Sequence, residues 1–143
     1  PERMKCRFYV GLVLDRKGQE YRELKTDAMG RLVLESGEVK YHHQLEKDDI
    51  PLFETRLLGD LVNHALDLPD EKLTGKERRA RFTLATRVQE AMDRGSDLII
   101  EKEDEKRIED AADAVKVPLF LDRILTALEE AERAEPKRLE AAE

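Results

Sequence analysis

The amino-acid sequence predicts an α+β fold, with N-terminal antiparallel hairpins of three or four strands followed by about four helices. Between residues 6 and 43 apolar residues alternate with polar ones, as in a half-buried strand, and after residue 51 they recur at helical spacing. A chain of 143 residues has the size of one domain. We therefore predict a single domain over 1–143, made of a β-hairpin part (1–50), a helical part (51–135) and a frayed tail (136–143).

Two hairpins are expected in the first part. Residues 6–14 (CRFYVGLVL) are rich in aromatic and β-branched residues, and the turn residues 15–18 precede a second strand at 19–24. Residues 31–35 and 38–43 flank Ser36-Gly37, a two-residue loop typical of a tight hairpin. Period two predicts that one set of side chains lines the inner face of a common sheet: Phe8, Val10, Leu12, Leu32 and Leu34.

Capping residues mark the next two helices. Thr55 is expected to cap a helix at 56–66. Thr74 is expected to cap a long helix at 75–94, with Glu77 as its capping-box partner and Gly95 as its terminator. The apolar stripe predicted for this long helix is Phe82, Ala85, Val88 and Met92, with Leu84 and Ala91 beside it.

Two further helices are predicted after a short apolar segment at 98–100. The first spans 103–116 and has an acidic first turn, which the helix dipole favours. The second begins at Pro118, a residue common at the first helical position, and continues to about residue 134. Their predicted apolar faces are Ile108, Ala111, Ala112 and Val115, and Leu121, Ile124, Leu125 and Leu128.

The charge pattern limits the class of partner. The net charge is −7, and residues 1–56 hold 11 acidic and 11 basic side chains, whereas residues 57–143 hold 22 acidic and 15 basic. An acidic body repels nucleic-acid phosphate and suits a basic protein partner. Charged residues make up 41 % of the chain and asparagine occurs once, a bias typical of hot-growing organisms, although it is also typical of helix-rich acidic proteins.

The chain is expected to be cytoplasmic. It has one cysteine, Cys6, interpreted as a buried strand residue, and no apolar run approaches the length of a membrane span. Residues 1–7 are polar and charged, so no secretion signal is expected.

No catalytic, cofactor-binding or metal site is predicted. His42, His43 and His64 are potential ligands, but adjacent strand residues point to opposite faces and no HxH or HExxH spacing is present. Ser36 and Ser96 lie outside any nucleophile elbow, and no glycine-rich phosphate loop occurs. A small metal-dependent enzyme using His42 or His43 stays open as the weakest alternative.

Two charged clusters have both a structural and a functional interpretation. The basic run fits the solvated face of a helix and consists of Lys76, Arg78, Arg79, Arg81 and Arg87. The acidic run fits a helix N-terminus and consists of Glu101, Glu103, Asp104, Glu105, Glu109 and Asp110. Functionally, each would bind a surface of opposite charge. The candidate partner-binding residues are Glu101, Glu103, Asp104, Glu105, Arg78, Arg79 and Arg81, with Tyr9, Tyr21, Tyr41 and Phe53 as candidate anchors.

Several short motifs carry a resemblance to a known group of proteins. They are Leu58-Gly59-Asp60-Leu61-Val62-Asn63 with Ala65-Leu66, then Leu73, Gly75 and Glu77, then Leu84-Ala85, and finally Pro118-Leu119. In these motifs the stretch from 57 to 128 resembles small accessory proteins of tailed bacteriophages. The chain departs from that group in having Thr74 where serine is usual and in its longer, aromatic N-terminal part.

Together with the thermophilic bias, the chain resembles a phage transcription inhibitor that acts on the RNA polymerase of a hot-growing, Thermus-type host. The resemblance implies binding to the holoenzyme at the sigma factor and the β-subunit flap. We expect a monomer without a cofactor and, from its acidic charge, without strong direct binding of nucleic acid. The alternative is a phage assembly adaptor or chaperone-like protein without enzymatic activity.

Overall fold

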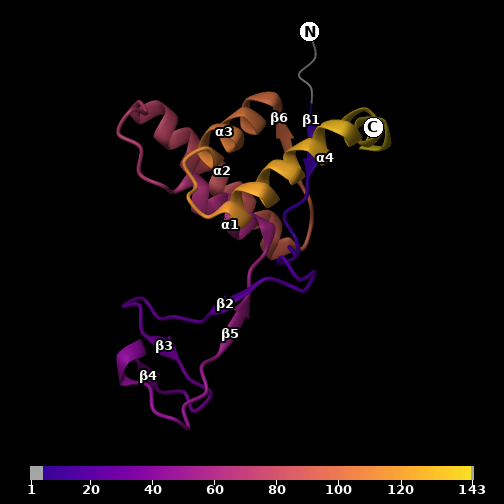
Figure 1. The fold of residues 1–143 in the computed structure, drawn as a ribbon. Coiled ribbons are helices and arrows are strands. Elements are labelled where there is room, and N and C mark those ends of the chain that lie inside the picture. Colours follow the sequence, from indigo (N-terminus) through magenta and orange to yellow (C-terminus); the bar gives the residue numbers. More distant parts are fainter. Residues whose placement is uncertain (1–4, 143) are drawn as a thin grey trace.

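The computed structural model describes residues 5–142, and side chains from 6 to 132. It is a mixed α+β structure with two visibly different regions, a helical body and a thin arm that extends away from it (Figure 1). We define the arm as residues 12–57. The body holds α1 (Leu58–Leu66), α2 (Gly75–Arg94), α3 (Lys102–Ala112) and α4 (Pro118–Ala142), together with the strands β1 (Lys5–Phe8) and β6 (Leu98–Glu101).

The first strand pairs with the far end of the chain. β1 and β6 are antiparallel, with Cys6 opposite Ile100 and Phe8 opposite Leu98. All four of these side chains are buried, and α4 packs along β1. The prediction that residues 6–14 form one long hairpin with 19–24 is therefore wrong for most of its length, because burial of Cys6 and Phe8 under the helices contributes more than a local strand contact. Only the bridge between Leu14 and Glu20 remains of it.

The arm contains short strands instead of one sheet. β2 (Arg22–Leu24) pairs with β5 (Phe53–Thr55), and β3 (Leu32–Val33) pairs with β4 (Val39–Lys40), all antiparallel. The predicted hairpin is present, but its loop has three residues, Glu35-Ser36-Gly37, and not two, because Val33 pairs with Val39 and the amide of Leu34 donates to the carbonyl of Glu38 at 2.9 Å. Gly37 adopts a left-handed conformation at φ 90°. The predicted common sheet of three or four strands is replaced, among the described residues, by three separate strand pairs.

The predicted inner face divides between the two regions. Phe8 and Val10 are buried in the helical core, whereas Leu32 and Leu34 are buried in the arm. Leu12 is exposed, contrary to the prediction, because it lies where the chain leaves the body. No helix in the described part of the chain combines the length and apolar character that a membrane crossing requires.

The sequence predicts α2 correctly at both ends. The amide of Glu77 donates to the hydroxyl of Thr74 at 3.1 Å, and Gly95 terminates the helix at φ 67°, a left-handed conformation that glycine adopts without strain. The carboxylate of Glu77 does not complete the predicted capping box and instead accepts a hydrogen bond from Arg107 of α3 at 2.8 Å. The N-terminal cap of α2 is thereby connected to the next helix.

The other helix ends differ from prediction. Thr55 lies in β5 and does not cap α1, which begins after Leu57 with the carboxylate of Asp60 accepting from the Leu57 amide at 2.8 Å. α3 ends at Ala112 instead of near 116. The backbone of α4 continues to Ala142, beyond the predicted end near 134, through most of the predicted frayed tail; residue 143 lies outside the described residues.

The buried face of α2 is rotated relative to the predicted stripe. Phe82 is 70 % exposed, whereas Arg81 is only 6 % exposed. Arg81 lies one turn before Leu84 and Ala85 and thus on the line of the helix that faces α1. Apolar character alone therefore predicts the wrong buried residue, because Arg81 is buried and its neighbour Phe82 is exposed. Leu84, Ala85, Val88 and Ala91 are buried as predicted, whereas Met92 is only half-buried.

A candidate protein-binding arm

The root of the arm is held by α4. The ring of Tyr21 contacts the ring of Phe120 edge-on, with 5.6 Å between centroids, and the guanidinium of Arg123 donates to the carbonyl of Leu14 at 2.9 Å. Burial, together with a hydrogen bond of 2.8 Å to the Glu23 carboxylate, raises the pKa of Tyr21 to about 12. The phenol therefore stays protonated at neutral pH and keeps its donor role. The arm leaves the body from a fixed position.

Further out, three backbone segments close a ring of hydrogen bonds. The amide of Lys25 donates to the carbonyl of Leu52 at 2.9 Å, that of Leu52 to Val33 at 2.9 Å, and that of Val33 to Lys25 at 3.0 Å. Each residue is both donor and acceptor, so the three segments satisfy one another without forming a longer sheet. This ring joins segments that are distant in the sequence, so at this level the arm consists of three hydrogen-bonded backbone segments.

Two carboxylates organise the turns at the tip. Asp27 accepts from the backbone amide of Arg31 at 2.9 Å and from its Nε at 2.8 Å, and Asp49 accepts from the amide of Glu46 at 2.8 Å and from Lys40 Nζ at 2.9 Å. The Arg31 amide bond lowers the pKa of Asp27, and the Glu46 amide bond, followed by the Lys40 bond, lowers that of Asp49. Both turns therefore depend on ionised aspartates.

Large apolar side chains lie on the outside of this arm. Between residues 15 and 56 the structure buries only Leu32 and Leu34, whereas Phe53 is 59 % exposed and Met29 is 66 % exposed. Between residues 15 and 56, the exposed apolar set of the arm comprises Leu24, Met29, Tyr41, Ile50 and Phe53. Leu24 and Phe53 are opposite one another in the β2–β5 pair, so their side chains share a face. Exposed apolar groups concentrated in this way are characteristic of interaction surfaces.

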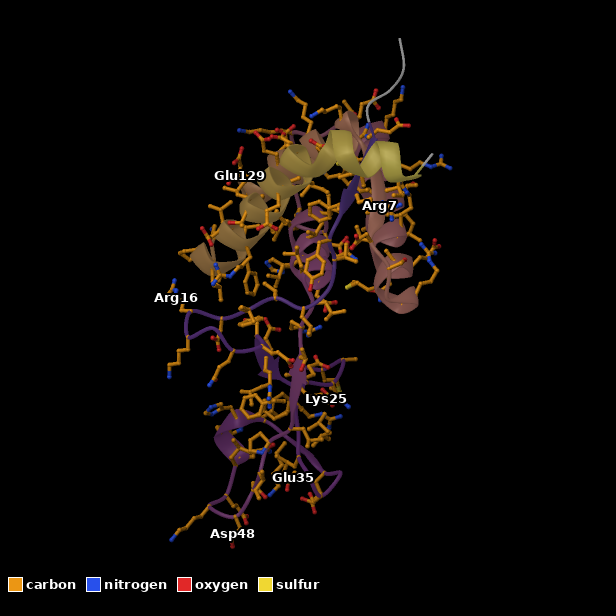
Figure 2. All side chains as sticks on the ribbon, turned by 90° about the vertical axis from the view of Figure 1, so that its right-hand side faces the viewer. Arg7, Arg16, Lys25, Glu35, Asp48 and Glu129 are labelled. Atoms are coloured by element: carbon orange, nitrogen blue, oxygen red, sulfur yellow. The ribbon has the colours of Figure 1, made fainter. Side chains whose placement is uncertain are left out.

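Polar groups surround the exposed apolar set. Figure 2 shows Lys25 and Glu35 along the arm, with Asp48 at the end away from the body and Arg16 near the junction. Residues 15–56 hold ten acidic and eight basic side chains, nearly balanced. Since an interface of this kind consists of an apolar centre with a polar rim, the arm has the composition of a binding element.

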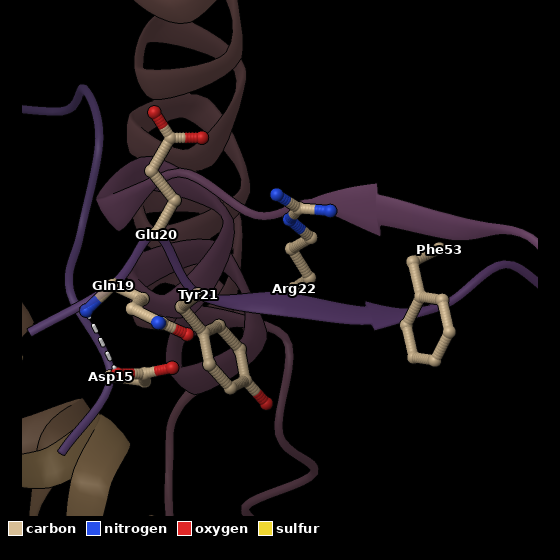
Figure 3. Close-up of a pocket in the computed structure, with 6 residues that line it drawn as sticks. All are labelled: Asp15, Gln19, Glu20, Tyr21, Arg22 and Phe53. Atoms are coloured by element: carbon tan, nitrogen blue, oxygen red, sulfur yellow. Dashed lines mark hydrogen bonds between the residues drawn. The ribbon is translucent and has the colours of Figure 1, made fainter. Parts of the chain in front are cut away.

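An open hollow of about 690 Å³ lies in the part of the arm near its root (Figure 3). Arg22 and Phe53 border it from the arm, and Asp15, Gln19 and Glu20 border it from the turn at the root, with Tyr21 between them. Figure 3 shows these side chains spread along the hollow and not converging on one point. A convergent set of groups is what a catalytic centre would need, whereas arginine and aromatic side chains on an open surface are typical of protein contacts.

The structure uses two residues of the predicted acidic cluster, Asp104 and Glu105, in internal contacts. Glu105 is buried and accepts a hydrogen bond from the Cys6 thiol. Asp104 accepts from the amide of Glu101 at 3.2 Å and from Arg87 of α2 at 3.2 Å. Of the four predicted acidic partner-binding residues, Glu103 is the one that lies exposed, and Glu101 is half-buried at the start of α3.

The predicted basic cluster divides in the same way. Arg79 is exposed, and Arg78 is exposed with one nitrogen donating to the carbonyl of Leu73 at 2.9 Å. Arg81 is buried, so the expectation that it presents its charge on the solvated face of α2 is wrong. Arg87 bonds Asp104 and the carbonyl of Ile99. The basic run therefore does not form one continuous patch.

The candidate anchors have different environments. Phe53 is the most exposed of the four, while Tyr21 is half-buried at the root and Tyr9 donates its hydroxyl to the carbonyl of Leu12 at 2.8 Å. Tyr41 is 39 % exposed and its ring stacks on that of His43, with 5.9 Å between centroids. Exposure therefore favours Phe53 as the anchor.

The histidines do not come together. His42 and His43 lie in a short 3-10 helix (His42–Gln44) of the arm, whereas His64 lies on α1 with its ring against Phe120. Among the described residues, no group of histidine, cysteine and carboxylate side chains has an arrangement that would hold a metal ion.

The sequence pattern singles out Phe53 and Tyr41 but does not predict the arm as a unit. The sequence does contain an indication of the arm, because Met29, Ile50 and Phe53 are large apolar residues within a segment rich in turns and charges.

Comparison of the chain with protein-family profiles, with curated proteins and with solved structures finds no match.

Proposed function

We propose that this protein is a phage-encoded regulator that binds the host RNA polymerase holoenzyme at the sigma factor and the β-subunit flap, and inhibits or redirects transcription from host promoters. The arm is the principal contact in this proposal. The observation that carries it is the placement of Leu24, Ile50 and Phe53 on the outside of a thin arm that buries few apolar side chains of its own. Burial of such side chains by a partner would supply affinity.

The charge of the body supports a partner with a basic surface. The chain carries a net charge of −7, with the acidic surplus after residue 56. A sigma domain that holds promoter DNA must itself present basic groups, so long-range attraction would bring the two together and short-range contacts of the arm would hold them. The resemblance of residues 57–128 to phage accessory proteins supplies the choice of polymerase as the target.

The experiment is a pull-down of the tagged full chain from a thermophilic bacterial lysate, followed by mass spectrometry. We expect the polymerase β subunit and sigma factor to be recovered, with less recovery at high salt because exposed charges are screened. Ile50→Ser on the arm should reduce recovery at least tenfold. Ile99→Ser is the matched control, because Ile99 is similarly exposed, at 42 % against 55 %, but lies on the body.

Two outcomes would overturn the proposal. Equal loss with Ile50→Ser and Ile99→Ser would remove the arm as the principal contact. Recovery of no polymerase subunit, with the chain forming particles or rings by light scattering, would favour the assembly adaptor.

A further inference from the structure

Arg81 is a largely buried cation for which the described residues provide no hydrogen-bond or ion-pair partner. It is 6 % exposed, its Nε is buried without a hydrogen-bond acceptor, and no carboxylate in the described part of the chain forms an ion pair with it. A buried charge without a counter-charge is strongly unfavourable, which makes an absent anionic ligand the simplest explanation.

Arg81 borders a pocket of about 210 Å³ at the junction of α1 and α2. This volume is about seven times the share of one water molecule in the liquid, enough for a short side chain. Arg78 also borders the pocket, and its bond to the carbonyl of Leu73 holds it at the edge. Arg78 lies in the first turn of α2, where the helix dipole adds positive potential, and Arg81 lies in the second turn. Most of the remaining wall is apolar: Leu66, Leu68, Pro69, Leu73 and Phe82.

The same pocket disfavours a highly charged anion. Asp67 and Asp70 border it, and neither forms an ion pair with Arg81. Two carboxylates nearby would repel a phosphate dianion more strongly than a carboxylate with a single negative charge. A guanidinium matches the two oxygens of a carboxylate geometrically, and the apolar wall would accept the carbon chain that carries it.

We infer that the Arg81 pocket binds a single carboxylate carried on a short apolar-acidic protein segment, such as a glutamate side chain next to leucine. Phe82, exposed at the rim, packs against the neighbouring apolar side chain of that segment. The site lies on the body, and its existence does not depend on polymerase being the partner of the arm.

The test observes Arg81 directly in the full chain. The Nε–Hε resonances of 15N-labelled protein are followed by NMR during titration with sodium acetate, with the peptide acetyl-Leu-Glu-Leu-amide and with inorganic phosphate. We expect a saturable shift of the Arg81 resonance with acetate, and a dissociation constant at least tenfold lower for the peptide. Arg81→Met should abolish saturable binding, whereas Arg79→Met, an exposed arginine of the same helix, should leave it unchanged.

The native protein suffices if Arg81→Met does not fold, because the resonance can be assigned without the variant. A non-saturating shift, or one equal in size at Arg79, would overturn the inference. Tighter binding of phosphate than of the peptide would overturn the carboxylate assignment and indicate a phosphate site. None of these outcomes involves polymerase, so they are independent of the pull-down.

Discussion

The thiol of Cys6 donates a hydrogen bond of 2.9 Å to the carboxylate of Glu105, so a buried residue of β1 holds a buried residue of α3. Lys102 Nζ lies 3.5 Å from the same carboxylate and supplies an opposite charge. The contact joins residues 99 positions apart in the sequence. A buried carboxylate is tolerated only with such partners, which makes this pair a specific restraint on how the first strand docks.

We predict that Glu105→Ala lowers the free energy of unfolding by about 1–3 kcal/mol, because it leaves the buried Cys6 thiol without this acceptor and removes packed atoms. Urea denaturation followed by circular dichroism measures the change. Glu103→Ala is the matched control, since it also removes a carboxylate from the first turn of α3 but is exposed; its effect should stay within about 0.5 kcal/mol. Equal effects would show that only the helix dipole is involved.

The cap of α2 gives a second prediction. Thr74→Ala removes the acceptor of the Glu77 amide and should destabilise the protein by about 1 kcal/mol in thermal or urea unfolding. Thr83→Ala makes the same chemical change in the middle of the same helix, where alanine is the better helix former, and should be neutral or slightly stabilising. A loss of the same size in both variants would contradict a capping role for Thr74.

The turns of the arm should loosen at acid pH. Folding lowers the pKa of Asp27, chiefly through the Arg31 amide bond, and that of Asp49, chiefly through the Glu46 amide bond. The unfolded chain then binds these protons more tightly, so each carboxylate stabilises the fold above its unfolded pKa of about 3.9. That contribution is lost as pH falls through the lower folded value.

NMR titration of the Arg31 amide, which is bonded to Asp27 at 2.9 Å, measures this effect. We expect its shift to change with a midpoint below about 3.9, and the change to disappear in Asp27→Asn. A midpoint above that of an unfolded aspartate would contradict the proposed role of the ionised side chain. Amides of α2 serve as an internal reference.

The hydrogen-bond ring predicts that the arm can be unfolded alone. Val33→Pro removes the amide that donates to the carbonyl of Lys25, and proline cannot replace that donor. We expect faster amide exchange over residues 24–53, while protection in α1 and α2 stays unchanged, because the core of the body includes neither Leu32 nor Leu34. Loss of protection in the body as well would show that the two regions unfold together.

Sequence reasoning succeeded where the signal is local. Thr74 and Gly95 bound α2, Pro118 begins α4 and Ser36-Gly37 closes a hairpin, since each depends on a few neighbouring residues and their backbone preferences. It failed where partners are distant. Residues 6–8 satisfy a strand pattern equally well with a nearby segment or with β6, and period two does not distinguish them. The predicted acidic cluster shows the same limit, because its composition does not reveal which carboxylates bind Cys6 or Arg87.

By itself, then, the sequence determined the α+β class, the order of hairpins before helices, and the ends of the best-capped helix. The tertiary structure alone decided that β1 pairs with β6, that Arg81 is buried while Phe82 is exposed, and that residues 12–57 extend as an arm with apolar groups outside. The physical reason is that caps and turns are stabilised by neighbours within a few residues, whereas burial depends on which distant surfaces meet. The arm and the Arg81 pocket both depend on contacts between segments that are distant in the sequence.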